Sequence, residues 1–328
     1  MTRTVRVTGS RHSRLLGIGG YRPRRVVGNA EVCRHIDSTD EWIRAHSGIE
    51  ERRFASADET LLMMSVAAAE KALAQAGTVP ADVDLVVLAS MSNLVQTPPL
   101  AVQVAHELGA RSAAAVDLSA ACAGFCHVLA VASDAVRAGS AQRVLVIGAE
   151  RMTDIVEPTD RTISFLFADG AGAAVVGAAG DPGIGPVVRR ADGALKQALR
   201  MTSSWAGGRD RPWMRMDGRR VFRWAVEEVT PAALQALDLA GVPVADLDAF
   251  VPHQANLRII EIMAARLALP PRTVVAQDVI RYGNTSAASV PLALETLLSE
   301  GRVSSGATAL LAGFGAGLNF AAQTVVLP

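Results

Sequence analysis

Short runs of apolar and β-branched residues alternate along this chain with longer Ala- and Leu-rich stretches whose apolar positions follow a helical period. Runs of five or six residues that are almost entirely apolar are typical of strands buried on both faces. They predict strands at 84–89, 143–148, 173–177 and 308–312. The longer stretches predict helices at 61–76, 122–138, 222–239 and 287–299. This alternation indicates an α/β protein with buried strands.

The same pattern also repeats. The string AGTVPADVDLVVLAS, which starts at Ala76, is matched by AGVPVADLDAFVPHQ, which starts at Ala240, 164 residues later and half of the 328-residue chain. The predicted strands RVLVIG and ATALLAG recur at nearly the same offset. We interpret the chain as a tandem duplication of one α/β unit, the alternative being a chance match of short strings. The Gly/Pro stretch 177–186 predicts the boundary between halves 1–178 and 183–328, and loop 203–212 is a second flexible candidate.

Composition narrows the class of protein. Hydrophobic residues make up 50% of the chain and charged residues 20%, so it can bury a core. The 32 basic and 32 acidic side chains cancel, which excludes a general nucleic-acid binder. The longest apolar run, 309–318, is far shorter than the roughly 20 residues that cross a bilayer, so we expect no membrane span. Three cysteines make neither a disulfide framework nor a zinc pattern, and they favour a cytoplasmic protein.

Cys122 is the candidate nucleophile. It stands where a short predicted strand, 116–119, runs through small residues into the helix 122–138. A thiol at a helix N-terminus meets the positive end of the helix dipole, so we expect a lowered pKa and a reactive thiolate. The alternative for a lone cysteine is a small buried apolar side chain, which we prefer for Cys33 and Cys126.

Two polar residues stand at matching places in the second half. His253 ends the duplicated strand, and open α/β folds place their sites at the carboxyl ends of strands. Asn284, in YGNTS, precedes the helix 287–299. Taken singly, they are more typical of a structural histidine and a turn. Taken with Cys122 at three junctions of a duplicated fold, they predict a nucleophile with two polar partners.

Eight strings in order extend this pattern over nearly the whole chain: STDEWIRAHSGIEERR, DLSAACAGF, EPTDR, ADGAGAAVV, MDGRRVFRWAV, VPHQANLRII, YGNTSAAS and GFGAGL. By these strings the chain resembles the β-ketoacyl-acyl-carrier-protein synthase III family of the thiolase superfamily. It is most similar to the actinobacterial priming ketosynthases that start aromatic polyketides. The resemblance implies thiolase-like duplicated α/β halves that form a layered αβαβα core, and it implies a homodimer.

The resemblance also implies a decarboxylating condensation in two stages. Cys122 would take a short acyl group from acyl-CoA, while the backbone N–H groups of Cys122 and Ala316 hold the oxyanion. Malonyl-acyl carrier protein would then lose CO2, and His253 and Asn284 would donate hydrogen bonds to the enolate that attacks the acyl group. Neither stage needs a metal or an organic cofactor, so we expect none.

Further roles follow from positions within the shared strings. Trp42 matches the residue that stacks on the CoA adenine, and Arg161 matches its partner at the base or phosphates. Residues of the pantetheine tunnel and its mouth are matched by Phe222, Asn256 and Arg258, and residues of the acyl pocket by Thr97 and Phe314. The Gly-rich strings GIGG (17–20) and GFGAGL lack the GxGxxG spacing of a dinucleotide loop, so we expect no NAD site.

Two positions depart from the family pattern. His46 stands where the family often has an arginine beside the CoA phosphates, which implies weaker or more pH-dependent binding of CoA. Thr97 stands where many members place an aromatic residue at the floor of the acyl pocket, contributed across the dimer. A smaller side chain implies a longer pocket that tolerates propionyl, butyryl or branched starters.

The alternatives keep the same scaffold. A cluster of arginines, Arg215, Arg219, Arg220 and Arg223, is either a solvated helix face or a basic rim that receives an acidic carrier protein. A non-condensing acyltransferase that moves the acyl group from Cys122 to an alcohol, amine or carrier protein is the second functional hypothesis. Asn284 favours condensation, because members that do not condense tend to change it. A thiolase is less favoured, because it would need a second cysteine as its base and the second half has none. A non-catalytic scaffold subunit is also less favoured, because it would not need to keep Cys122, His253 and Asn284.

Overall fold

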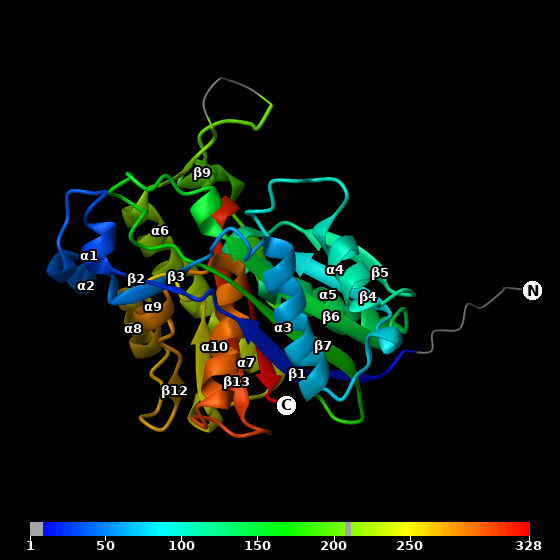
Figure 1. The fold of residues 1–328 in the computed structure, drawn as a ribbon. Helices are drawn as coiled ribbons and strands as arrows, with labels where there is room; N and C mark the ends of the chain where they lie inside the picture. Colours follow the sequence, from blue (N-terminus) through cyan, green and yellow to red (C-terminus); the bar gives the residue numbers. More distant parts are fainter. Residues whose placement is uncertain (1–8, 207–210) are drawn as a thin grey trace, which may run out of the picture.

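Two five-stranded mixed sheets form the framework of the computed structural model, which describes residues 9–206 and 211–328 (Figure 1). The first sheet has the order β1 (His12–Tyr21), β7 (Asp169–Ala179), β6 (Arg143–Arg151), β4 (Leu85–Ala89), β5 (Ala114–Leu118). The second has the order β8 (Val188–Ala191), β14 (Asn319–Val326), β13 (Thr308–Gly315), β11 (Ala249–Pro252), β12 (Val274–Val275).

The two sheets share one topology. In the first, β4 pairs in parallel with β5 and β6, and β7 runs antiparallel to β6 and β1. In the second, β11 pairs in parallel with β12 and β13, and β14 runs antiparallel to β13 and β8. Strand order and direction therefore agree with a duplicated α/β unit. The predicted linker 177–186 spans the connection from β7 to β8, while the division at 178 and 183 stays a prediction.

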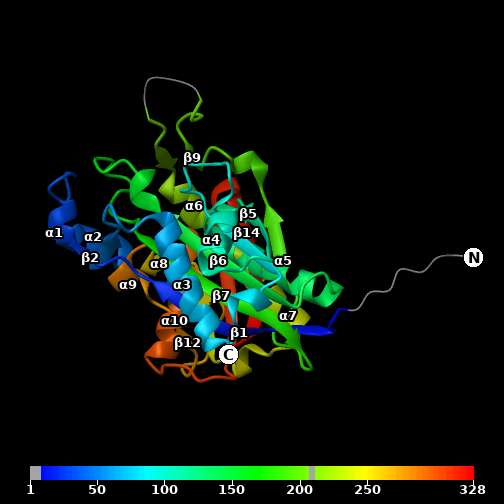
Figure 2. The ribbon, with the colours of Figure 1, turned by 45° about the vertical axis from the view of Figure 1, so that its right-hand side comes forward.

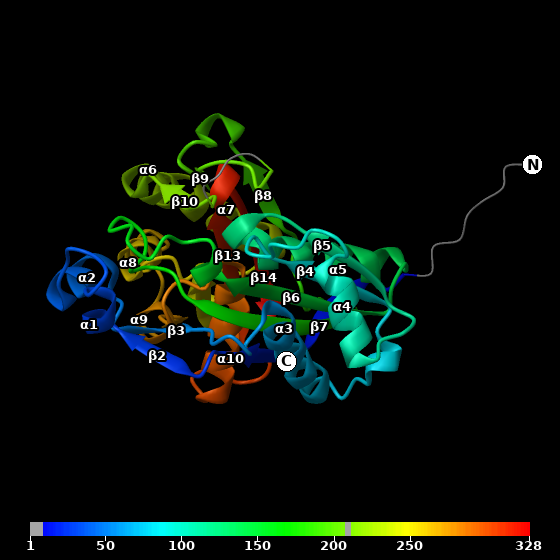
Figure 3. The same cartoon turned by 45° about the horizontal axis from the view of Figure 1, so that its top comes forward.

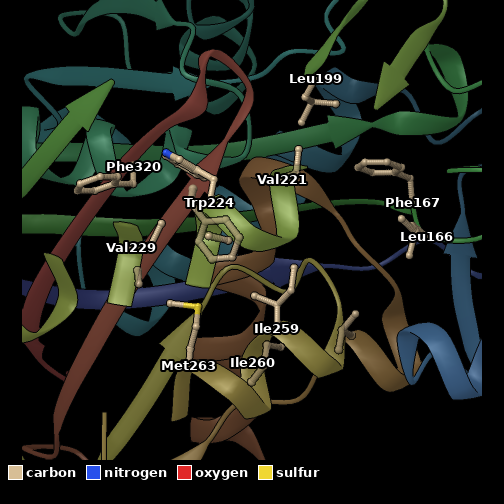
Figure 4. Close-up of a cluster of buried hydrophobic side chains, with 14 of the residues drawn as sticks. Leu166, Phe167, Leu199, Val221, Trp224, Val229, Ile259, Ile260, Met263 and Phe320 are labelled. Atoms are coloured by element: carbon tan, nitrogen blue, oxygen red, sulfur yellow. The ribbon is translucent and has the colours of Figure 1, made fainter. Parts of the chain in front are cut away.

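Helices and sheets alternate in five layers, as predicted. Between the sheets lie α5 (Gly124–Ala138) and α10 (Ser289–Ser299), each in contact with strands of both sheets. The outer face of the first sheet is covered by α3 (Leu61–Gln75) and α4 (Leu100–Leu108) (Figure 2). On the outer side of the second sheet, α7 (Thr230–Ala240) and α8 (Leu257–Arg266) share a buried cluster with its strands. Figure 4 shows Ile259, Ile260 and Met263 of α8 in this cluster, together with Phe320 of β14.

Burial on both faces explains why the strand patterns are apolar throughout. Successive side chains of a strand point to opposite faces. In β4, Val86 and Leu88 join the cluster under the outer helices, and Val87 and Ala89 join the cluster between the sheets. A strand in this position needs an apolar residue at every place, so its sequence does not alternate.

The predicted elements are confirmed, with differences at three helix starts. A 3₁₀ turn, η2 (Ala121–Ala123), precedes α5, and a second one, η7 (Ser286–Ala288), precedes α10. The predicted helix 222–239 consists of α6 (Gly218–Trp224), a π-helical turn (Ala225–Val229) and α7.

A cap of smaller elements covers one end of the layered core (Figure 3). It contains β2 (Arg25–Gly28), α1 (Asn29–Val32), α2 (Asp40–Ser47), β3 (Glu51–Phe54), β9 (Leu199–Met201), β10 (Met214–Met216) and α9 (Val279–Tyr282). Arg52, which is fully buried, donates to the carbonyls of Val27 and Phe165 and to Oδ1 of Asn29. Of the predicted flexible loop 203–212, residues 207–210 lie outside the described part of the chain.

The segment Ala121–Ala138 is long and apolar enough to cross a membrane by length and composition. It contains α5, which lies between the two sheets and contacts both of them. Its apolar character therefore reflects burial from two sides. This segment is the central helix of the fold.

The glycines of β1 allow a helix to lie close to the sheet. A Cβ atom at Gly17 would stand 2.4 Å from the carbonyl oxygen of Ala72, and one at Gly19 would stand 2.3 Å from that of Ala68. Both carbonyls belong to α3, whose side facing the sheet consists largely of alanines. The glycines of the GIGG string therefore allow α3 to pack closely against β1.

We predict that Gly19→Ala destabilises the protein by about 1–3 kcal/mol, because the new methyl group must displace the backbone of α3. Chemical denaturation would measure the change. Gly180→Ala is the matched control, because a Cβ at that loop position meets nothing within 4 Å and the free energy of unfolding should stay the same. Equal stability of the two variants would contradict this account of β1.

Candidate active site

One cavity of about 1080 Å³ brings together most of the predicted site residues. It begins between the cap and the second sheet and reaches the turn that carries the cysteine. Its lining contains residues from both halves of the chain, and the predicted residues among them are Trp42, Cys122, Phe222, His253, Asn256, Arg258, Asn284 and Phe314. The duplication therefore joins the thiol of the first half to the imidazole and amide of the second.

A tight turn places Cys122 at the floor of this cavity. Ala121 has a positive φ of 47°, which turns the chain sharply between β5 and η2. Gly315, at the end of β13, lies against the cysteine, since a Cβ there would be 2.8 Å from the Cys122 nitrogen. Cys122 itself is only 4% exposed.

Burial shifts the pKa of the Cys122 thiol in the direction opposite to the one expected. It raises the pKa of Cys122 to about 12; the nearby Ser286 hydroxyl lowers this pKa, and the charge of Glu150 raises it further. The prediction of a lowered pKa is therefore wrong for the resting thiol. Loss of water outweighs the contacts that favour the thiolate, and Cys122 lies within the turn η2, before the start of α5.

His253 follows the last residue of β11, as predicted, and burial sets its state. Burial lowers the pKa of His253 to about 3, so the ring is neutral at physiological pH. Its Nδ1 lies 2.7 Å from Oγ of Ser289, which accepts a hydrogen bond from the backbone N–H of Gln254. The Ser289 hydroxyl can then donate its hydrogen to Nδ1. In that tautomer Nδ1 is the acceptor, and the ring hydrogen is on Nε2. His253 can therefore donate a hydrogen bond into the cavity.

Asn284 is held by its own backbone and by the next turn. Its N–H donates to the carbonyl of Leu166, and its carbonyl accepts from the N–H of Ala168. Its Oδ1 accepts from the backbone N–H of Ser286 at 2.9 Å. This bond orients the side-chain amide, so Nδ2 is the group that can donate to a ligand beside His253.

The loop after β13 is tied to the helix that follows Cys122. Asn319 donates from Nδ2 to the carbonyl of Ala316, and its Oδ1 pairs with Nε2 of His127 on α5. Gly317 has a φ of 88°, which suits glycine. Ala316 is half-buried beside Gly315, and its role at the oxyanion stays a prediction.

The far end of the cavity carries the predicted nucleotide site. Trp42 and His46 stack with ring centroids 4.1 Å apart, and the guanidinium of Arg161 lies 5.5 Å from the Trp42 ring. His46 lines the cavity. Arg161 does not line it, but it contacts Trp42, which does. Asn256 caps α8 and donates to the His46 carbonyl, which ties the tunnel to α2.

The arginine cluster divides into two groups. Arg219 and Arg223 line the cavity together with Arg258 and Arg266. The other two arginines of the cluster pair with acidic residues, Arg215 with Glu157 and Asp160, and Arg220 with Asp217.

Thr97 does not line the cavity of the single chain. It is exposed, in the loop between β4 and α4, so its predicted place in the acyl pocket depends on a second chain. Phe314 is buried next to Gly315 at the carboxyl end of β13, and its ring lies nearly perpendicular to that of His253 with the two ring centroids 5.1 Å apart.

Three polar residues of the site were missed from the sequence. Ser286 and Ser289 stand in the string YGNTSAAS, and Glu150 follows the predicted strand 143–148. The rule that found His253, a polar residue at the carboxyl end of a buried strand, also applies to Glu150. It was missed because it comes two residues after the last residue of the predicted strand.

A buried thiol, a neutral imidazole and an amide that meet between duplicated α/β halves define the class of thiolase-fold acyl-transferring enzymes. Comparison with known sequences agrees. Family models described as 3-oxoacyl-[acyl-carrier-protein] synthase III, and as the C-terminal part of that enzyme, match residues 116–193 and 237–327.

Similar proteins extend the match over the whole chain. The β-ketoacyl-[acyl-carrier-protein] synthase III of Streptomyces lividans is 56% identical over 99% of this chain and 97% of its own. That of Streptomyces glaucescens is 48% identical over 100% of both chains. Among solved structures, the priming β-ketosynthase of the R1128 polyketide pathway has 56% identity, a TM-score of 0.98 and 99% coverage of both chains. The Aquifex aeolicus synthase III has 37% identity, a TM-score of 0.89, and coverage of 96% of this chain and 99% of its own.

The chain belongs to the β-ketoacyl-[acyl-carrier-protein] synthase III family. It is therefore an enzyme of the acyltransferase class, and the predicted resemblance to priming ketosynthases is confirmed.

We predict that Ser289→Ala lowers kcat for condensation by about tenfold, the value of one hydrogen bond, because the ring hydrogen of His253 is no longer held on Nε2. Formation of the acyl-enzyme should not change. Ser299→Ala is the control on the same helix, since its hydroxyl only donates to the Thr296 carbonyl. Steady-state kinetics would separate the two variants, and equal kcat values would contradict the assigned role of Ser289.

Proposed function

We propose that this protein joins a short acyl-CoA starter to malonyl-acyl carrier protein by decarboxylating condensation and releases a 3-ketoacyl-acyl carrier protein. The meeting of Cys122, His253 and Asn284 in one cavity is the observation that carries the proposal. A thiol can hold the acyl group, and two neutral donors can hold an enolate oxygen. This set of groups suits condensation better than acyl transfer alone.

In the first stage, the acyl-CoA enters with its adenine at Trp42 and Arg161 and its pantetheine arm along the tunnel. The sulfur of Cys122 attacks the thioester carbonyl, and CoA leaves as the thiol. The backbone N–H groups of Cys122 and Ala316 are proposed to bind the oxyanion of this step.

In the second stage, malonyl-acyl carrier protein occupies the emptied tunnel. Loss of CO2 leaves an enolate, whose oxygen accepts from Nε2 of His253 and Nδ2 of Asn284. Its carbon attacks the carbonyl of the acyl-Cys122, and the thiolate leaves. Because the imidazole is neutral, it donates a hydrogen bond without quenching the carbanion by full proton transfer. The proposed reaction uses no metal and no organic cofactor.

The carrier protein is proposed to dock at the mouth of the cavity. Arg219, Arg223 and Arg258 line the cavity there. An acidic carrier protein with a phosphopantetheine arm would be attracted by this charge, and the attraction would weaken with salt.

A homodimer in the cytoplasm is proposed as the working form. The edge strand β5 pairs with β4 on one side, and Val116 on it is 47% exposed. Other large apolar side chains are exposed on the neighbouring loop and on α4: Leu94, Val95 and Val102. An exposed strand edge with apolar side chains suits pairing with a second copy. Thr97 lies on the same loop and would reach the partner's acyl pocket, where a small side chain admits longer starters.

We predict that Cys122→Ala forms no acyl-enzyme, whereas Asn284→Ala forms it but condenses about 100-fold more slowly, because one donor to the enolate is lost. Mass spectrometry of the intact protein with acyl-CoA would detect the thioester, and product assays with malonyl-acyl carrier protein would measure condensation. Acylation of Asn284→Ala is also the check that it folds. Full condensation by Asn284→Ala would contradict the proposal and favour the non-condensing acyltransferase.

We predict that the wild-type protein elutes at about twice its mass of 34.3 kDa and that Val102→Glu with Val116→Glu elutes as a monomer. The two-fold axis would bring like charges together at this face. Leu239→Glu, at an apolar position on α7 that is at least as exposed, is the control and should stay dimeric. Light scattering after size-exclusion chromatography would decide, and a monomeric wild-type protein would contradict the dimer.

A further inference from the structure

Glu150 is a fully buried carboxylate that the proposed reaction leaves without a role. It lies near the end of β6, where it accepts hydrogen bonds from hydroxyl and backbone N–H groups. Met91 N–H and the hydroxyls of Ser90 and Ser92 donate on one side. On the other side, Oε1 accepts from the Ser286 hydroxyl at 2.9 Å.

Ser286 connects this carboxylate to the nucleophile. Its hydroxyl hydrogen is donated to Glu150, which leaves the Ser286 oxygen able to accept from the nearby thiol of Cys122, whose turn packs against that of Ser286. Ser286 has a positive φ of 50°, and Ala121, at the corresponding place before Cys122, has 47°. Two strained turns from the duplicated halves therefore face each other, and one carries the thiol while the other carries the hydroxyl.

The thiol needs such a partner, because the tautomer of His253 leaves no ring nitrogen toward the cavity that could accept its proton. The hydroxyl of Ser289 binds Nδ1, so the cavity-facing Nε2 of His253 carries a hydrogen. A nitrogen with a hydrogen donates and does not accept. The proton of Cys122 must therefore go to a group other than Nε2 of His253.

We propose that Ser286 and Glu150 form a proton relay that activates Cys122. The S–H bond breaks and its electron pair stays on sulfur; the proton moves to Oγ of Ser286, whose own proton moves to Oε1 of Glu150. Glu150 does not touch the sulfur, so it is a positioning residue that acts through Ser286. The inference rests on the proposed role of Cys122 as the nucleophile.

The relay keeps the buried charge constant. Before the transfer one negative charge lies on Glu150, and after it one negative charge lies on the sulfur. Transfer to a neutral histidine would instead create an ion pair in a site with little water. An ionised Glu150 raises the pKa of Cys122, so the two groups share one charge and titrate as a coupled pair.

The Glu150 carboxylate changes its protonation state near physiological pH. Burial raises the pKa of Glu150 to about 7, against the hydrogen bonds from Ser92 and Ser286. Below that pH, Glu150 is protonated and cannot accept a proton. Above it, the carboxylate is available, so the reactivity of Cys122 should rise through pH 7 and then level off.

Other charged groups near Glu150 are engaged elsewhere. Arg151, the next residue on β6, pairs with Asp154. Asp169 lies opposite Arg151 in the backbone register of β6 and β7. Its carboxylate accepts hydrogen bonds from the Thr153 hydroxyl and from the backbone N–H of Ala55. Burial raises the pKa of Asp169 to about 6, so Asp169 is the group that most needs to be separated from Glu150 by experiment.

Alkylation of Cys122 by iodoacetamide between pH 5 and 9 tests the relay, with the modified peptide quantified by mass spectrometry to exclude Cys33 and Cys126. We expect the wild-type rate to rise with an inflection near pH 7. Glu150→Gln should lose the inflection and react at least about tenfold more slowly at pH 8. Ser286→Ala, which keeps Glu150, should do the same.

Asp169→Asn is the matched control, because it removes a second buried carboxylate that does not contact Ser286. It should keep the inflection. An unchanged profile in Glu150→Gln, or loss of the inflection in Asp169→Asn, overturns the proposal. Alkylation requires no acyl-CoA or carrier protein, so a wild-type protein that shows the inflection but does not condense would count against the proposed function and leave the relay in place.

Discussion

The close contact of the two duplicated halves is the constraint on which the structure depends. The turns η2 and η7 meet between the sheets, and Gly315 from the second half lies against Cys122 from the first. The central helices α5 and α10 follow these turns and are covered by both sheets. A site built at such a contact combines groups that stand far apart in sequence and holds them on rigid elements.

The contact has an electrostatic consequence, because it removes water from three ionisable groups at once. Burial raises the pKa values of Cys122 and Glu150 and lowers that of His253. Each group is thereby driven toward its neutral form. A neutral imidazole suits hydrogen-bond donation to an enolate. A neutral thiol, by contrast, is a weak nucleophile, so the site needs a means of moving one proton away from sulfur.

The cavity that leads to this site changes character along its length. At the floor it is closed by β13 and the two turns, and at the mouth it is lined by arginines and by the stack of Trp42 and His46. Arg52 supports this mouth from within, because it ties the backbone before α1 to the carbonyl of Phe165. The cap therefore positions the nucleotide end, while the duplicated core positions the chemistry.

The sequence by itself determined the α/β class, the duplication, and the places of Cys122, His253 and Asn284. Those features depend on local patterns: apolar runs mark buried strands, and polar residues after such runs mark the carboxyl edge of a sheet. Only the tertiary structure decided the protonation state of Cys122, because desolvation depends on what lies around the sulfur. It also decided the partners of His253 and Glu150. Ser289 lies on α10 and Ser286 on the turn before it, and in the sequence both look like ordinary small residues. Glu150 reaches the Ser286 hydroxyl only because the two halves fold against each other.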